Sequence, residues 1–296
     1  MKFLHTLRQD LNKTIINAGF IGATLMTCLL AFTGSAYRDD TNDKSYSILE
    51  AFFSFDRRFI ETREDFSSFR LFGNGLGGYI TMFIPIIVAF PFMVSFCAER
   101  NNGLMRFTIT RTGRMRYYLS KFSASFLGGG LAVMLGMAIF GIILRFSFPP
   151  ISSYDIDPEM LKWTLPHGEF QAVVRVLLSA FLYGAFSTLP AFFLSSFCKN
   201  PYIITCLPFM LVYVWQTAIN KIQAKMFENI MSGGFDQELM DKLSAFNPSS
   251  PRNIVSVFFD DMTPTLKYSL IFNGIYLAVL LAGFILIMNL RTDKGN

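Results

Sequence analysis

The residue types that most often do chemistry are few in this chain and stand far apart. It has two histidines, His5 and His167, and four cysteines without a C-x-x-C pair. Zinc sites and thiol redox centres need closely spaced residues of these types. The G-x-x-x-x-G-K-[ST] loop that cradles nucleotide phosphates is also absent. We therefore expect no catalytic residue, no metal site and no cofactor in this chain.

A dense group of charged residues spans positions 99–121. Glu99 begins it, six basic residues follow, and Leu104 and Phe107 give a short amphipathic pattern between them. A short helix with this pattern would lie at a membrane surface, where a cytoplasmic partner could push on it. The alternative is a charged loop that serves only to anchor the topology of the chain.

Long uncharged stretches surround this group and must position it. There are six, of 21 to 28 residues each, and together they hold 142 of the 296 residues. A helix of about 20 apolar residues crosses the hydrocarbon core of a bilayer. Charged residues make up 16% of the chain, against about 25% in soluble domains. The sequence therefore predicts an all-α membrane protein with six transmembrane helices, and argues against a soluble enzyme and a secreted disulfide scaffold.

The predicted spans leave a short N-terminal helix and three exterior segments. The spans cover residues of about 15–37, 78–98, 119–145, 173–198, 201–220 and 267–290. The exterior segments are 38–77, 146–172 and 221–266. Apolar residues at helical spacing in positions 1–13 predict a helix that lies in the membrane interface: Phe3, Leu4, Leu7 and Leu11.

Two exterior stretches carry more specific expectations. Four phenylalanines recur at helical intervals in the first segment and predict an exterior helix: Phe52, Phe55, Phe59 and Phe66. In the third segment, the apolar run 254–259 is too short to cross a bilayer. It predicts either a re-entrant or interfacial element, or a buried piece of an exterior cap.

Charge distribution predicts that both termini are cytoplasmic. With the termini inside, the uncharged stretches leave 43 inside residues (1–13, 99–121, 199 and 291–296), which carry twelve basic and three acidic residues. The outside residues 38–70, 146–174 and 221–267 carry twelve basic and eighteen acidic residues, so the positive-inside rule favours this orientation. The net charge of +5 is then an orientation signal and no indication of nucleic-acid binding. His5 and His167 would lie on opposite sides of the membrane, where they cannot share a metal ion.

Prolines and glycines within the spans suggest hinges and close contacts. Pro85, Pro91 and Pro208 lie inside predicted spans, where proline frees backbone carbonyls and kinks the helix. They are our candidates for hinges along a pathway, although kinked helices also occur in static bundles. Gly128–Gly130 and Gly136 form a small-residue face that predicts close helix packing.

The segment after the second predicted span resembles the coupling-helix region of type-2 ABC transporter permeases. The matching positions are Glu99, Gly103, Leu104, Thr110, Arg111, Tyr117, Tyr118, Leu119 and Lys121. Residues 194–201 are similar to the family's Leu-Ser turn with Lys-Asn between the fourth and fifth spans. The usual proline after the Thr/Ser step is replaced here by Arg111-Thr112-Gly113.

The resemblance implies that residues 1–296 form a single transmembrane permease domain of an ATP-driven exporter in a bacterial plasma membrane. It implies a second permease subunit, identical or homologous, and two copies of a separate ABC ATPase that binds ATP and Mg. Coupling to the ATPase would use Glu99, Arg100, Gly103, Leu104, Arg106, Phe107 and Arg111. Glu99 would pair with a basic residue of the ATPase, or hold the loop through Arg100 or Arg106.

The substrate class and the competing functions stay open at this point. Spans rich in phenylalanine favour a hydrophobic or amphipathic substrate such as a peptide, a lipid or a drug. An ATP-independent transporter is one alternative, but it would need charged groups in the middle of spans. An immunity-type membrane protein without an ATPase partner is another.

Overall fold

The computed structural model describes residues 2–39, 44–155, 168–198, 200–230, 237–252 and 264–293, together with residues 157, 159, 165 and 254. These residues are mostly helical. In chain order the elements are α1 (Lys2–Ile15), α2 (Ala18–Ala31), β1 (Ser35–Asp39), β2 (Lys44–Ser47), α3 (Ile48–Ser54), α4 (Arg57–Thr62), η1 (Glu64–Phe66), α5 (Ser68–Asn74), α6 (Ile80–Ile87), α7 (Phe90–Asn101), α8 (Leu104–Thr112), α9 (Arg114–Ser147), η2 (Ile151–Ser153), α11 (Glu169–Ser187), α12 (Leu189–Leu194), α13 (Pro201–Ile230), α14 (Gln237–Ala245) and α15 (Pro264–Asp293).

Five helical segments within the described residues are long and apolar enough to cross a membrane. They are Ile80–Asn101, Arg114–Ser153, Glu169–Leu194, Pro201–Met226 and Lys267–Arg291. Helices α1 and α2 give a sixth if the pair, bent by 59°, counts as one broken span. The prediction of a helical membrane protein is therefore confirmed. The structure has five or six candidate spans, where the sequence predicted six.

The predicted first span, 15–37, agrees with the structure at its start but was wrong at its end. The predicted N-terminal helix corresponds to α1, and the side chain of Asn17 accepts a hydrogen bond from the Gly19 amide and caps α2, so the chain turns between the two helices. Helix α2 has 14 residues and ends at Ala31. A helix of that length is roughly 21 Å long, which is less than the roughly 30 Å of a bilayer core.

The first exterior segment is not the single helix predicted from its phenylalanines. Strands β1 and β2 form an antiparallel hairpin, and the short helices α3, α4 and α5 follow. Ser47 and Glu50 form a capping box at the start of α3, and hydrogen bonds from the Ser47 backbone and hydroxyl lower the pKa of Glu50. Asp56 begins a new helix, because its side chain accepts from the Arg57 amide.

The phenylalanine spacing reflects aromatic packing instead. The rings of Tyr37, Phe55, Phe59 and Phe66 form a cluster with centroids 4.9 to 6.3 Å apart. The guanidinium of Arg63 lies over the rings of Tyr37 and Phe59, at 4.7 and 4.9 Å from their centroids. This cluster ties the hairpin to the short helices that follow it.

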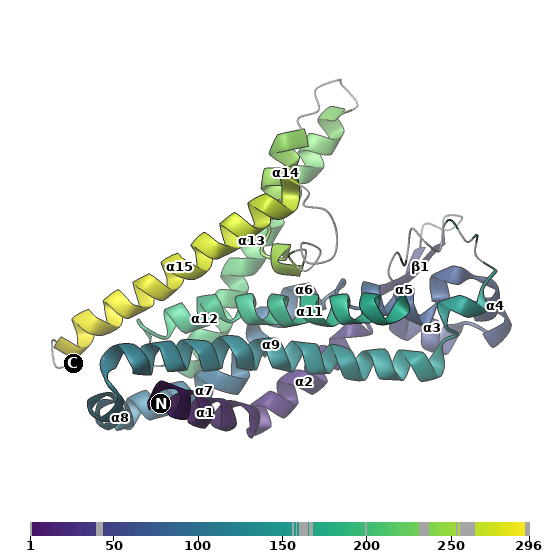
Figure 1. Ribbon diagram of the computed structural model, residues 1–296. Coiled ribbons are helices and arrows are strands. Elements are labelled where there is room, and N and C mark those ends of the chain that lie inside the picture. The colour runs from purple at the N-terminus through teal and green to yellow at the C-terminus, as the bar shows by residue number, and fades with distance from the viewer. Residues whose placement is uncertain are drawn as a thin grey trace.

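Helix α9 is the central element of the bundle and packs against α1, α2 and α11 (Figure 1). The predicted small-residue face makes these contacts. A Cβ built on Gly128 would lie 2.4 Å from Thr14 of α1, and one on Gly136 would lie 2.6 Å from Thr27 of α2. These distances are shorter than any ordinary contact, so only glycine allows the helices to approach so closely.

Two of the three hinge candidates, Pro85 and Pro208, lie inside helices, and the third, Pro91, lies at the start of one. Pro85 is inside α6, and Pro91 is in the first turn of α7, so the second predicted span is two helices joined at residues 88–89. Pro208 is inside α13. The rings of Phe83 in α6 and Phe209 in α13 stack at 5.7 Å, so the helices that contain Pro85 and Pro208 contact each other directly.

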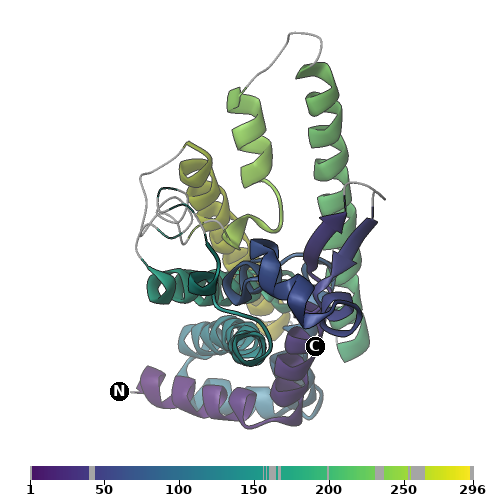
Figure 2. The same cartoon turned by 90° about the vertical axis from the view of Figure 1, so that its right-hand side faces the viewer.

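Helices α13 and α15 leave the bundle at an angle, and α14 packs against α15 at their far end (Figures 1 and 2). The most apolar part of α15 is only 11% buried inside the protein, and that of α13 is 28% buried, against 61% for α6 and α7. These two helices therefore present most of their apolar surface outward, as lipid-facing helices do.

Candidate functional site

Helix α8 is a separate short helix at the same end of the molecule as both chain termini (Figure 1). It runs for nine residues between Gly103, with φ of 71°, and Gly113, with φ of 89°. Side chains other than glycine rarely adopt such angles, so the two glycines permit the sharp turns from α7 into α8 and from α8 into α9. A short helix in this loop, as predicted, is thus confirmed, and its place at a membrane surface stays a prediction.

The outer face of α8 exposes apolar side chains next to basic ones. Phe107 is 76% exposed and Leu104 is 52% exposed, whereas Met105 is buried against the bundle. The side chains of Arg106 and Arg111 are also exposed. An exposed phenylalanine beside basic residues is suited to a protein partner or to lipid headgroups.

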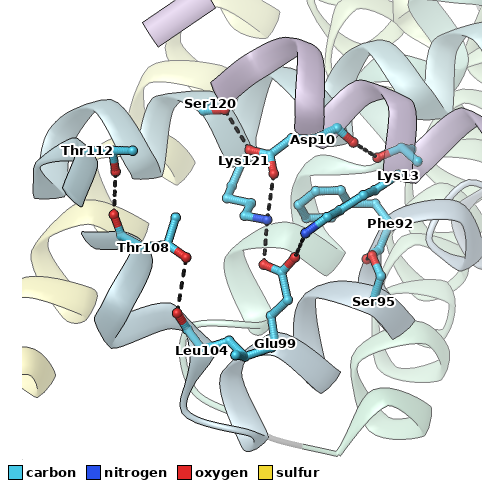
Figure 3. A network of polar contacts seen from close by, with 11 residues as sticks. Asp10, Lys13, Phe92, Ser95, Glu99, Leu104, Thr108, Thr112, Ser120 and Lys121 are labelled. Atoms are coloured by element: carbon cyan, nitrogen blue, oxygen red, sulfur yellow. Dashed lines mark hydrogen bonds and ion pairs between the residues drawn. The ribbon is translucent and has the colours of Figure 1, made fainter. Parts of the chain in front are cut away.

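Glu99 lies directly behind α8 and is held by two lysines (Figure 3). Lys13 of α1 donates to its Oε1 at 2.8 Å, and Lys121 of α9 donates to its Oε2 at 2.6 Å. Both oxygens of this carboxylate therefore bind lysines of the same chain. The predicted pairing of Glu99 with Arg100 was wrong, because the Arg100 guanidinium binds backbone carbonyls after α12.

Lys121 also binds a second carboxylate. Its Nζ lies 2.8 Å from Oδ1 of Asp10, and the Ser120 hydroxyl donates to Oδ2 of Asp10 at 2.6 Å (Figure 3). The side chains of Lys121 and Asp10 are only 5% and 6% exposed. We call these five residues the polar network: Asp10, Lys13, Glu99, Ser120 and Lys121. It balances two carboxylates with two ammonium groups and joins α1, α7 and α9.

Arg100 binds the turn after α12. Its guanidinium donates to the carbonyl oxygens of Ser195, Ser196 and Cys198, the last at 3.0 Å. Arg291 of α15 donates to the carbonyl of Phe197 in the same turn at 3.0 Å. Carbonyls at the end of a helix lack partners within the helix, and cations there offset the negative end of the helix dipole.

The structure thus brings together two of the segments that the sequence analysis singled out. Residues 99–121 and the turn at 194–198 lie far apart in sequence, and Arg100 connects them. Asp10, Lys13 and Ser120 were not predicted as site residues. The available signal was that Asp10 is one of only three acidic residues in the segments predicted to be inside.

A second polar group lies between α11, α13 and α15. Residues 247–252, the inserted segment, follow α14 and pack into the bundle, where Ser250 and Pro251 are buried. Asn273 of α15 donates to Ser250 Oγ at 3.0 Å and to the Ser269 carbonyl at 2.8 Å. Pro248 and Pro251 line a cavity of about 20 Å³ beside Trp215, so the inserted segment nearly fills this space.

Arg252 anchors the end of the inserted segment. It donates to the carbonyl of Leu76 at 2.8 Å, and its guanidinium lies 5.8 Å from the ring of Tyr183 in α11. Ile254 is buried as well, while the rest of the predicted re-entrant run lies outside the described residues. Neither Asn273 nor Arg252 was predicted as a site residue. A single amide or a single arginine forms no sequence pattern that indicates its contact partner.

Replacing Asn273 with leucine should loosen the inserted segment. The change keeps the side chain's size but leaves the Ser250 hydroxyl without this donor, at a cost of about 1–2 kcal/mol. We therefore expect limited trypsin cleavage after Arg252 to become roughly tenfold faster, since cleavage follows the population of the opened state.

Gln216→Leu on α13 is the matched control, because it also removes an amide from an apolar helix. Its cleavage rate should stay at that of the unmodified protein. Equal cleavage of both variants would show that Asn273 does not hold the segment.

No protein-family model matches this chain, and no curated protein sequence matches it. Among the residues that the structure describes, no three His, Cys, Asp or Glu side chains are grouped so that they could hold a metal ion. His167 lies outside those residues. The candidate site therefore has two parts. One is α8 with the polar network behind it, and the other is the inserted segment between α11, α13 and α15.

Proposed function

We propose that this chain is the membrane-spanning permease subunit of an ATP-driven exporter, and that a separate ABC ATPase binds to α8. The observation that carries the proposal is the placement of α8. This helix exposes Leu104 and Phe107, turns on two glycines, and rests on a buried network of charged residues that reaches three other helices.

The polar network gives a route for force from α8 into the bundle. A push on α8 reaches Glu99 at the end of α7 and, through Lys121, reaches α9 and α1. Helix α7 continues into α6 across the break at residues 88–89, and α6 contacts α13. An ATPase that binds α8 differently in its ATP-bound and ATP-free states would shift the bundle between two conformations. ATP and Mg would bind to the ATPase and not to this chain.

In this proposal, the inserted segment closes the substrate path until the bundle changes conformation. It occupies the space between α11, α13 and α15, at the far side of the bundle from α8. A conformational change that moved α13 through its contact with α6 would release this segment and open a path for an amphipathic substrate. A second permease subunit would cover part of the exposed apolar surface of α13 and α15.

The position of the charged groups favours a subunit driven by a partner over an ATP-independent transporter. Ion and proton pathways place charged groups in the middle of spans. Here Glu99 lies in the last turn of α7, and Lys121 lies near the start of α9. The network is therefore at one end of the bundle, beside the proposed binding surface.

Replacing Phe107 with aspartate should strongly weaken binding of the ATPase. A buried aromatic anchor in an interface contributes about 2 kcal/mol or more, so we expect at least a roughly 30-fold loss of affinity. The measurement is co-purification of the tagged chain from its source cells with an ABC ATPase subunit, followed by ATP hydrolysis of the complex.

The control is Phe53→Asp, at the other end of the molecule. Phe53 is 78% exposed and Phe107 is 76% exposed, so the two substitutions change equally accessible side chains. The control variant should bind the ATPase normally. If the unmodified chain does not associate with the ATPase, the permease proposal is wrong; if Phe107→Asp binds as well as the control, α8 is not the surface.

A further inference from the structure

A cavity of about 750 Å³ lies at the end of the molecule opposite α8. It is open to the outside on one side and is lined by α3, α4, the last residues of α9 and the segment through η2, elements that lie on the right of Figure 1. Small-molecule sites in proteins usually measure about 300–1,000 Å³. This cavity is therefore large enough for a ligand, and no residue of the polar network or the inserted segment takes part in it.

One wall of the cavity is aromatic. Phe148 is buried and fixes the inner part of the wall, while Phe55 belongs to the aromatic cluster described above. Phe52 and Phe146 also line the cavity and are 44% and 88% exposed. The apolar wall is thus rigid on the inside and accessible from outside at the end of α9.

The other side of the cavity carries two opposite charges. Arg57 and Glu61 lie one turn apart on α4, with Arg57 Nε 3.2 Å from Glu61 Oε1. Both side chains are well exposed, so the pair contributes little to stability and each charge remains accessible to a ligand. Ser147 adds a hydroxyl group to the lining.

Tyr154 holds this charged helix in place. Its hydroxyl donates to the carbonyl of Ile60 at 3.0 Å and so joins α4 to the segment after η2. Burial, together with nearby Glu61, raises the pKa of Tyr154 to about 12, so the hydroxyl stays protonated and keeps donating at physiological pH. The spacing between the charged side and the aromatic wall is therefore defined.

We propose that this cavity binds a zwitterionic phospholipid. The lipid phosphate lies at Arg57, its ammonium group lies at Glu61, and the start of its acyl chains packs against Phe52 and Phe146. Helix α9 ends at Ser147, so the cavity lies at the level of the bilayer headgroups if α9 spans the membrane. Aromatic side chains are common at that level because one side of the ring is apolar and the other is wet.

Other ligands of similar size fit the cavity less well. A soluble zwitterion such as an amino acid would leave the aromatic wall in water. An anionic phospholipid has no cation for Glu61 and would bring its own negative charge close to that carboxylate. The proposal does not depend on the ATPase, so lipid binding and the permease function can fail separately.

Native mass spectrometry of the purified, delipidated full chain in detergent tests the proposal. With equal amounts of phosphatidylethanolamine and phosphatidylglycerol, we expect about fivefold preferential retention of phosphatidylethanolamine, the size of one exposed charge pair. Glu61→Arg should reverse the preference toward phosphatidylglycerol. Arg57→Glu should weaken phosphatidylethanolamine binding about fivefold, whereas Arg58→Glu, on the same helix but outside the cavity lining, should not.

Two further measurements complete the test. Phe146→Ala changes an exposed residue that the fold does not need, and it should weaken lipid binding about tenfold through lost apolar contact. Soluble glycerophosphoethanolamine at the same concentration should not displace the lipid. Equal retention of the two lipids, an unchanged preference in Glu61→Arg, or displacement by the soluble headgroup would each overturn the proposal.

Discussion

Replacing Lys121 with methionine should lower the free energy of unfolding by about 3–5 kcal/mol, the usual cost of breaking a buried ion pair. Methionine keeps the apolar length of the side chain but removes the ammonium group that Asp10 and Glu99 share. Two carboxylates would then lie close together with only Lys13 to balance them, in a site where Asp10 is 6% exposed. Charged groups that lose their partner in such a site are strongly unfavourable.

Lys13→Met is the matched control for this prediction. Lys13 binds the same carboxylate, Glu99, but its side chain is 63% exposed, so we expect a loss below about 1 kcal/mol. Unfolding in detergent by heat or denaturant measures both variants. Adding Asp10→Asn and Glu99→Gln to Lys121→Met should recover much of the loss, since the unpaired charges are then gone. Similar losses in the two single variants would mean that the network is effectively solvated.

Replacing Gly184 with alanine should separate α9 from α11 and lower the free energy of unfolding by about 1–3 kcal/mol. The added Cβ would lie 2.7 Å from the carbonyl oxygen of Gly129 and 2.7 Å from Cγ2 of Val133. The first of these neighbours is backbone, which cannot rotate away as a side chain can. The helices must therefore move apart along the most extensive contact in the bundle.

Gly274→Ala is the corresponding control on α15. A Cβ at that position has no neighbour within 4 Å, so the substitution brings only the better helix propensity of alanine, up to about 1 kcal/mol. The same unfolding measurement should show a loss for Gly184→Ala and none for Gly274→Ala. Equal effects would indicate that α9 and α11 adjust without cost.

The sequence predicted most of the apolar helices correctly, but it did not predict where every helix ends. The predicted second and sixth spans, 78–98 and 267–290, agree with helical segments Ile80–Asn101 and Lys267–Arg291 to within a few residues. The first span was predicted to end at residue 37, but α2 ends at Ala31 and residues 35–39 pair as a strand. An uncharged stretch therefore does not have to be helical over its whole length.

Helix ends were also hard to place from hydropathy. The fifth predicted span ended at residue 220, whereas α13 continues to Ile230. The polar residues after the apolar stretch remain helical. Hydropathy predicts which residues can lie in the hydrocarbon core and does not predict where the helix ends.

In the candidate site too, the sequence predicted the features that depend on neighbouring residues and missed those that depend on distant ones. Glu99 and the short helix after it could be predicted, because a charge at the end of a span and a short apolar pattern are local signals. The partners Lys13 and Asp10 could not, since Lys13 is 86 residues from Glu99 and Asp10 is 111 residues from Lys121. Asn273 and Arg252 depend on contacts of the same long-range kind.

The uneven burial of the helices bears on how the chain is made. Helices α1 to α12 contain most of the buried core, including the central α9, and all of them precede α13 in the sequence. As the chain is synthesised from its N-terminus, this part can assemble before α13 and α15 have left the ribosome. The polar network joins residues between positions 10 and 121, so its charges can pair during early insertion. Helix α15, with so little of its surface buried, is then added last, when Arg291 reaches the turn already held by Arg100.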